Sequence, residues 1–339
     1  MKVYISFDYE LFLGRETGSV EKSLILPTKQ LVMLADRAGT NVRYVFFVDS
    51  LYLIKLKEEA KESNVLKSDY EKIISQLKNL VEKGHDLQLH LHPQWFYAKY
   101  NIKVGKWEQD FNHYKLDDCS LPDVEIMVRE SVDLLETISG YKPTAYRAGG
   151  YCFPQKQEYK AILKRYGITK DSSVIMGKSA SGKYQTFNYS KIRCFNSYSF
   201  DDISQMDNKG SFTEYPISAI RINPLKYYFI IMRVKSQNGV TLMTVGDGKG
   251  VVKTLPLLKR ISEKVLSIFK TVYMPASVDK TNVLWLDKVY REAIDKRSDI
   301  MVIIGHPKNL TAFALERLEQ FVRENKINSS TFRDNLEKY

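Results

Sequence analysis

Side chains suited to catalysis or metal binding gather in two short segments of the chain. Three of the five histidines lie within residues 85–92. In the segment Leu87–His92, leucines alternate with polar residues, and His90 and His92 occupy alternate positions. Because side chains along a β-strand point to opposite faces in turn, a strand here would place both imidazoles on one face and the leucines in a core.

The second segment is the strand-like run Val3–Glu10, near the start of the chain. Its polar residues Ser6, Asp8 and Glu10 also occupy alternate positions and would share one face of a strand. Two carboxylates and two imidazoles supply the oxygen and nitrogen ligands of a catalytic zinc site. The two segments therefore predict a metal centre, provided that the fold brings them together.

Strands and helices alternate along most of the chain. Ser120, with Pro122 in the first helical turn, and Gly140 mark the start and end of one helix. Helices are expected at Pro27–Ala38, from Ser68 to Gly84, from Ser120 to Gly140, at Tyr159–Tyr166 and at Leu310–Val322, and strands at Met1–Phe7, Val42–Val48, Leu87–His92 and Ile300–Ile304. Such repeated units predict a parallel sheet or barrel with its ligand at the carboxyl ends of the strands.

Residues 178–250 interrupt this alternation. The segment holds turns rich in Gly, Ser, Lys and Asn, and two runs with strand-like composition, Lys226–Val234 and Val240–Val245. We interpret it as a central insertion within one domain that spans residues 1–339.

Composition narrows the range of partners. The 339 residues carry 51 Lys and Arg against 40 Asp and Glu, a formal net charge of +11. Such a charge favours nucleic acids, membrane surfaces or anionic substrates. No compact basic motif with interleaved aromatic residues is present, so we expect no nucleic-acid partner. A carbohydrate substrate, anionic or lipid-linked, remains compatible with the charge, and the sequence does not indicate an oligomeric state.

The location of the protein is expected to be cytoplasmic. No apolar run is long enough to span a membrane, and the first residues form a strand-like run rather than a secretory signal. The three cysteines, Cys119, Cys152 and Cys194, are odd in number and lack the spacing of a metal site, as expected of free thiols in a reducing compartment.

Several segments, in this order along the chain, resemble the motifs of the NodB-like polysaccharide deacetylases. They are Phe7–Glu10, Val45–Val48, Gly84–His90, Tyr146–Gly150, Gly167–Ser173 and Ile303–Pro307. The resemblance implies an α/β fold, an irregular (β/α)7 barrel of the polysaccharide deacetylase type, here with a central insertion.

The resemblance also implies roles for individual residues. Glu10 and His90 would bind a divalent metal, with zinc as the first choice, and Asp8 would be the general base. His306 would protonate the leaving group, and Arg147 would orient Asp8 through a charge-assisted hydrogen bond.

The sequence departs from the family at one metal ligand. The family has two histidines four residues apart, and here Gln94 stands where the second would follow His90. Three alternatives follow: His92 replaces the missing ligand, or the site binds metal weakly, or it binds none. His90 and His92 share a strand face, which permits the first alternative, although Pro93 could turn the chain before His92 points inward.

These observations lead to one principal hypothesis and two rivals. The principal hypothesis is metal-dependent hydrolysis of an acetyl group from an N-acetylated sugar or polysaccharide precursor. The first rival is a non-catalytic glycan-binding protein on the same barrel with a degenerate metal site, and the second is a glycosidase that uses Asp8 and another carboxylate directly. In each case Gly149 and Gly150 would let the backbone approach the sugar, and Trp95 could stack on it.

Overall fold

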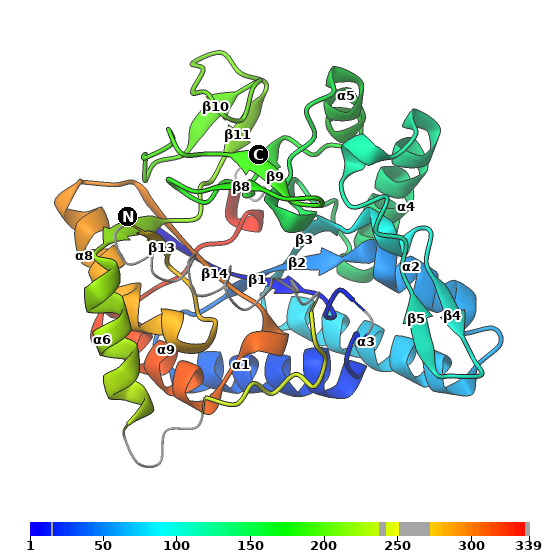
Figure 1. Cartoon of the computed structure of the whole chain (residues 1–339), viewed down its shortest axis with the longest axis horizontal. Coiled ribbons are helices and arrows are strands. Elements are labelled where there is room, and N and C mark those ends of the chain that lie inside the picture. The colour runs from blue at the N-terminus through cyan, green and yellow to red at the C-terminus, as the bar shows by residue number, and fades with distance from the viewer. Residues whose placement is uncertain (15, 237–241, 251–271, 336–339) are drawn as a thin grey trace, which may run out of the picture.

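The computed structural model describes residues 1–14, 16–236, 242–250 and 272–335, and an eight-stranded curled sheet lies at its centre (Figure 1). The strand order is β10-β11-β7-β6-β3-β2-β1-β14. These strands are β1 (Lys2–Tyr9), β2 (Tyr44–Asp49), β3 (Asp86–Leu91), β6 (Ala145–Ala148), β7 (Lys170–Asp171), β10 (Tyr198–Phe200), β11 (Phe212–Glu214) and β14 (Ile300–Gly305). Neighbours from β11 to β14 run parallel, and β10 pairs antiparallel with β11. The predicted α/β fold with a parallel sheet is confirmed.

The two ends of the parallel array are linked by short bridges. Ile175, beyond β7, pairs with Ile217, and Ser277 pairs with Ile304 of β14, both in parallel. Between them, Ser218 donates its backbone N–H to the carbonyl of Val302 at 3.0 Å. These bridges curl the sheet around its inner face, so side chains from distant strands meet there.

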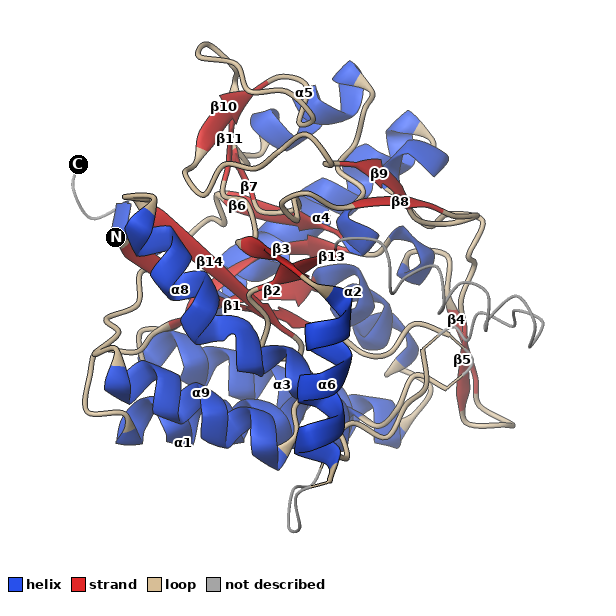
Figure 2. Cartoon of the chain, turned by 60° about the vertical axis from the view of Figure 1, so that its left-hand side comes forward, coloured by secondary structure: helices blue, strands red, loops and turns tan. Residues whose placement is uncertain are grey.

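Helices cover the outside of the sheet. They are α1 (Leu26–Arg37), α2 (Ser50–Glu59), α3 (Asn64–Glu82), α4 (Leu121–Ser139), α5 (Gln157–Arg165), α6 (Pro224–Lys235), α8 (Leu286–Asp295) and α9 (Ala312–Glu324). In both views α1, α3 and α9 form a layer on one side of the sheet (Figures 1 and 2). None of the described helices is long and apolar enough to cross a membrane.

The helix boundaries follow local capping signals. Ser120 accepts a hydrogen bond from the backbone of Asp123 at the start of α4, and Gly140 ends that helix with φ of 79°, as predicted. The predicted start of α3 at Ser68 is wrong. The helix begins five residues earlier because Ser63 is the N-cap and its side chain accepts from the backbone N–H of Leu66.

The segment of residues 178–250 differs from its predicted secondary structure. Lys226–Val234, expected as a strand, lies in helix α6, where Asn223 caps the first turn and Pro224 occupies its first position. Val240–Val245 lies partly outside the described residues, and its described part, residues 242–245, forms no strand. Strands β10 and β11 from this segment join the main sheet.

The remaining strands form three small antiparallel pairs. They are β4 (Lys99–Asn101) with β5 (Lys106–Glu108), β8 (Ser179–Ser181) with β9 (Thr186–Asn188), and β12 (Ala219–Ile222) with β13 (Val272–Pro275). The β8–β9 hairpin lies on the side of the sheet opposite the α1, α3 and α9 layer (Figure 1).

The register of the parallel strands aligns polar residues at one edge. Asp49 of β2 pairs with His90 of β3, and His90 pairs with Arg147 of β6. Asp8 is the last residue but one of β1 and pairs with Phe47 of β2. Since the carboxyl ends of parallel strands meet at the same edge, this register brings the candidate site residues together.

Candidate metal centre and catalytic site

Asp8 of β1 and Arg147 of β6 form a buried ion pair. Arg147 donates from Nη1 to Asp8 Oδ1 at 2.7 Å. Its other nitrogens donate to the Oγ atoms of Ser6 and Ser172, both at 2.9 Å, and to the Ser172 carbonyl at 2.8 Å. The guanidinium carbon also lies 4.0 Å from the centroid of the Phe47 ring. The guanidinium is thus fixed on several sides and holds Asp8 in place.

Asp8 remains ionised although it is buried. Burial by itself would raise the pKa of Asp8, but the positive charges of Arg147, His90 and His306 outweigh that effect and hold the pKa below its usual range. Its second oxygen, Oδ2, lies 3.4 Å from His306 Nε2. Asp8 therefore presents one carboxylate oxygen to Arg147 and the other to the interior of the site.

His90 and His92 both approach the side chain of Glu10. His90 Nδ1 lies 2.6 Å from the carbonyl oxygen of Arg147, which fixes the proton on Nδ1 and leaves Nε2 free, 3.4 Å from Glu10 Oε2. His92 Nδ1 lies 3.1 Å from Glu10 Oε2 and 3.1 Å from Asp49 Oδ2. The two imidazole rings are nearly perpendicular, with centroids 4.5 Å apart.

Glu10, His90 and His92 can together hold a metal ion. Each offers one ligand atom, and these atoms lie within 4.8 Å of one another. Two imidazole nitrogens and one carboxylate oxygen are a donor set that suits Zn²⁺ and leaves an open position for water or substrate. The buried Asp49 carboxylate lies beside this group: its Oδ2 is 3.1 Å from His92 Nδ1, the nitrogen that also faces Glu10, and its Oδ1 has no hydrogen-bond partner among the described residues.

His306 lies beside Asp8 and Glu10 and is held in place by Asp279. Its Nδ1 lies 2.7 Å from Asp279 Oδ2, and its backbone N–H donates to Asp279 Oδ1 at 2.9 Å. Its Nε2 faces Asp8 Oδ2 at 3.4 Å and Glu10 Oε1 at 3.6 Å. Burial opposes protonation of this imidazole, but the negative charges of Asp279, Asp8 and Glu10 raise its pKa to about 9. The His306 imidazole is therefore held in its charged form at neutral pH.

A lysine also lies against Glu10. Lys308, in the 3₁₀ helix Pro307–Asn309, donates from Nζ to Glu10 Oε1 at 2.9 Å and to the carbonyl of Leu11 at 2.6 Å. Burial would raise the pKa of Glu10, but the charges of Lys308 and His92 and the hydrogen bond to His90 hold it well below its usual value.

The structure brings all six predicted site residues to one place, Asp8, Glu10, His90, His92, Arg147 and His306. Three further residues at the site, Asp49, Lys308 and Asp279, were not predicted from the sequence. Asp49 ends the apolar strand β2, and Lys308 lies three residues after the end of β14. Their places at or soon after strand ends could have indicated a role at the site. Asp279 lies in a loop after β13, where the sequence offers no such indication.

Two neighbouring residues, Gln94 and Trp95, are fully buried. Gln94 is fully buried, and neither polar atom of its amide has a partner among the described residues. The prediction that Trp95 could stack on a sugar is wrong. The residue is fully buried and packs against Tyr52 and Trp107, with ring centroids 4.8 and 5.4 Å away.

The two glycines after β6 lie where an added Cβ would clash with neighbouring atoms. A Cβ on Gly149 would lie 2.5 Å from the carbonyl oxygen of Leu91 and 2.6 Å from Cδ2 of His92. A Cβ on Gly150 would lie 2.7 Å from the ring of Tyr114. The absence of a side chain at Gly149 thus leaves space for His92 beside Glu10, and the predicted approach of a sugar to these glycines stays a prediction.

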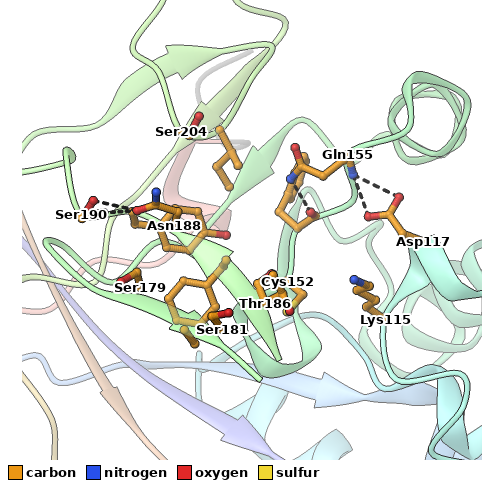
Figure 3. Close-up of a pocket in the computed structure, with 15 residues that line it drawn as sticks. Lys115, Asp117, Cys152, Gln155, Ser179, Ser181, Thr186, Asn188, Ser190 and Ser204 are labelled. Atoms are coloured by element: carbon orange, nitrogen blue, oxygen red, sulfur yellow. Dashed lines mark hydrogen bonds between the residues drawn. The ribbon is translucent and has the colours of Figure 1, made fainter. Parts of the chain in front are cut away.

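The loop that follows β6 also lines a cavity of about 620 Å³ (Figure 3). Its walls come from the β8–β9 hairpin and from the loop that continues through Cys152 to Gln155. The lining is rich in hydroxyl and amide groups and includes the aromatic ring of Phe187. Asp117, one of two charged residues there, has both carboxylate oxygens bonded to the backbone N–H of Gln155.

The hairpin is fastened to the loop between the cavity and the site. Gln185 donates to the carbonyl of Gly150 at 2.8 Å, and the Tyr189 hydroxyl donates to the carbonyl of Tyr151 at 2.7 Å. The loop after β6 therefore contacts the imidazole of His92 through Gly149 and the cavity through Cys152.

Comparisons with known proteins give likeness in structure only. No family model matches the chain, and no curated protein matches it. A GH57-type branching enzyme from the hyperthermophilic archaeon Pyrococcus horikoshii is 10% identical, with 100% of this chain and 70% of that chain covered and a TM-score of 0.52. A family 4 carbohydrate esterase from Streptomyces lividans is 10% identical, covering 97% and 92%, with a TM-score of 0.38. The Bc1960 peptidoglycan N-acetylglucosamine deacetylase is 15% identical, covering 52% and 61%, with a TM-score of 0.31. The chain shares the fold of the branching enzyme, and an esterase and a deacetylase of carbohydrates are among the other matching structures.

Proposed function

We propose that the protein hydrolyses an acetyl group from an N-acetylated sugar or polysaccharide precursor with the help of a divalent metal, zinc in the first place. The observation that carries this proposal is the group Glu10, His90 and His92, whose ligand atoms lie within 4.8 Å of one another. Next to this group lie a buried carboxylate, Asp8, and a charged imidazole, His306, whose Nε2 is 3.4 Å from Asp8 Oδ2 and 3.6 Å from Glu10 Oε1.

The proposed mechanism uses two proton transfers. A metal bound by Glu10, His90 and His92 would supply polarisation of the acetyl carbonyl and a lowered pKa of water. Asp8 takes the proton of the attacking water, and Arg147 keeps that carboxylate oriented through the 2.7 Å hydrogen bond. His306, charged through Asp279, donates a proton to the departing amine.

We also propose where the rest of the glycan lies. The cavity beside the β8–β9 hairpin has the size of ordinary ligand sites, and its hydroxyl, amide and aromatic lining suits sugar rings. Its link to His92 through residues 149–152 would place neighbouring sugar units near the reacting one.

The finer fold assignment belongs to the same proposal. The parallel strands and the bridges near β14 support an irregular (β/α)7 barrel of the polysaccharide deacetylase type. Residues 1–339 would then form a single domain, with residues 178–250 as its elaborated part.

One observation favours a second candidate, the glycan-binding protein without catalysis. The Lys308 ammonium already neutralises Glu10 at 2.9 Å, as a permanent cation would in a site that has lost its metal. In that case the protein would bind sugars and release no acetate.

A glycosidase or branching activity, as in the Pyrococcus horikoshii enzyme, fits the charges less well. Glycosidases require one carboxyl group that stays protonated until it protonates the leaving oxygen, and its pKa is raised for that purpose. Here the pKa values of Asp8 and Glu10 are both lowered by neighbouring cations.

The test is acetate release from N-acetylhexosamine oligosaccharides, measured together with metal content and new reducing ends. We expect acetate without new reducing ends, and loss of activity with a chelator. Asp8→Asn should lower kcat by about 10²- to 10⁴-fold because the general base is removed, with metal content unchanged. Full activity of Asp8→Asn would contradict the proposed base, and sugar binding without metal or acetate would favour the second candidate.

A further inference from the structure

Lys308 is an ammonium group buried within the proposed metal centre. The residue is 6% exposed. Its Nζ donates to Glu10 Oε1 at 2.9 Å and to the Leu11 carbonyl at 2.6 Å, and it lies 5.1 Å from the centroid of the Phe12 ring. A buried ammonium requires a partner of opposite charge, and Glu10 is the carboxylate that supplies it in the described part of the chain.

The two oxygens of Glu10 face different cations. Oε2 faces the imidazoles, 3.4 Å from His90 Nε2 and 3.1 Å from His92 Nδ1. Oε1 faces Lys308 at 2.9 Å and His306 Nε2 at 3.6 Å. A metal ion among Glu10, His90 and His92 would therefore find only Oε2 available, on a carboxylate that already carries a hydrogen-bonded positive charge.

Electrostatics gives the direction of the effect. A fixed positive charge next to a ligand carboxylate repels a divalent cation at the same carboxylate, and burial strengthens this repulsion because little water screens it. The same charge keeps Glu10 in position when no metal is bound, so the metal-free site needs no rearrangement to accept one.

We infer that Lys308 is a positioning residue that restricts Glu10 to one ligand oxygen and weakens metal binding, so that the site holds its metal loosely and exchanges it. This inference rests on the metal centre of the proposed function. It concerns the affinity and exchange of the ion, which the proposed function leaves open.

The test compares the binding of Zn²⁺ and Co²⁺ to the wild-type chain and to two variants, Lys308→Met and Lys308→Gln. Titration calorimetry and competition with a chromophoric chelator give the dissociation constants. The matched control is Lys160→Met in α5, since Lys160 is also 6% exposed but donates to a backbone carbonyl, that of Asp201, at 2.7 Å. We expect both Lys308 variants to bind metal at least tenfold more tightly and to release it more slowly, and Lys160→Met to match the wild type.

The outcomes separate this inference from the proposed function. If the wild type and folded Lys308 variants bind metal with equal affinity, or if the variants bind it more weakly, the inference is wrong and the metal centre stands. If neither the wild type nor any folded variant binds metal, both are wrong. Lys308→Gln retains a donor for the Leu11 carbonyl, so it answers the question even if the methionine variant does not fold.

Discussion

The third ligand of the proposed metal centre depends on whether residue 92 or residue 94 supplies it. The family pattern places a histidine ligand at position 94, but the structure buries the Gln94 amide without hydrogen-bond partners among the described residues, while His92 Nδ1 lies 3.1 Å from Glu10 Oε2. His92 thus lies where a third ligand could sit, and its assignment as that ligand stays a prediction.

A methionine at position 94 tests that assignment. Gln94→Met keeps the shape of the side chain and removes buried polar atoms that lack partners, so the free energy of unfolding should rise by about 1–3 kcal/mol. Metal content should stay the same. Urea unfolding and metal analysis would check both, with His92→Ala as the comparison expected to lose metal. Loss of metal in Gln94→Met would instead identify Gln94 as a ligand.

The predicted convergence of residues is confirmed for those that lie on or directly after a strand, β1 or β3. Asp8, Glu10, His90 and His92 were found because alternation along a strand needs only local sequence. Lys308 was missed because its contact with Glu10 joins residues 298 positions apart, and nothing in the local sequence shows which carboxylate a lysine will meet.

At the scale of elements, the loop after β6 controls the position of His92. In Gly149→Ala the new Cβ would lie 2.6 Å from His92 Cδ2 and 2.5 Å from the Leu91 carbonyl oxygen, so the imidazole must move away from Glu10. We expect metal affinity to fall about tenfold or more, a loss of roughly 1.4 kcal/mol. Calorimetric titration with Zn²⁺ would measure it. Gly182→Ala is the control, since its Cβ would come no closer than 3.5 Å to another atom. Unchanged affinity in Gly149→Ala would contradict the packing described.

Strands β7 and β11 place two buried carboxyl groups opposite each other, Asp171 and Glu214. Burial raises the pKa of Asp171 to about 6, and burial together with the charge of Asp171 raises the pKa of Glu214 well above its usual value. A carboxyl whose pKa is raised on folding stabilises the folded state at low pH, and this contribution is lost as the pH rises through the folded pKa. The pair should therefore weaken the fold as the pH rises above about 4, the pKa of an unfolded carboxyl, and the Asp171 part of this loss is complete near pH 6.

Glu214→Gln tests this pH dependence. The amide can still donate to Asp171 but cannot ionise, so the variant should be more stable than the wild type at pH 8 by about 1–3 kcal/mol and nearly equal at about pH 4. Urea unfolding at the two pH values gives the difference. Parallel pH profiles for the two proteins would show that folding does not raise the pKa of Glu214.

Element prediction depended on whether the local signals agreed. For α4, the Ser120 cap, the apolar face and Gly140 all pointed to a helix, and the helix is there. For Lys226–Val234, the aromatic and β-branched residues favoured a strand, but Asn223 and Pro224 begin a helix, and the capping signal was the correct one.

At the scale of the whole molecule, the net charge of +11 bears on the choice of glycan. A positive protein attracts anionic substrates over a distance set by salt. We expect kcat/KM for an anionic N-acetylated glycan to fall several-fold as salt rises from about 0.02 to 0.2 M. A neutral oligosaccharide of the same length is the control and should show no such fall. Equal salt dependence for both substrates would leave the charge without a role in substrate choice.

The overall architecture was the most predictable level. Repeated strand and helix signals gave a parallel α/β sheet, because each unit is read from about thirty residues of local pattern. The contribution of β10 and β11 to the main sheet was not predicted, since strands this short carry too few residues to show alternation.

Strand β1 lies between β2 and β14, and β14 begins only at Ile300. During synthesis, a nascent chain that has emerged only as far as α8 therefore has one edge of β1 without its permanent neighbour. That edge carries unpaired backbone groups, which invite pairing with other chains. The step that completes the sheet also brings His306 to Asp8 of β1 and Lys308 to Glu10 just beyond it, so the candidate site forms only when the exposed edge is covered.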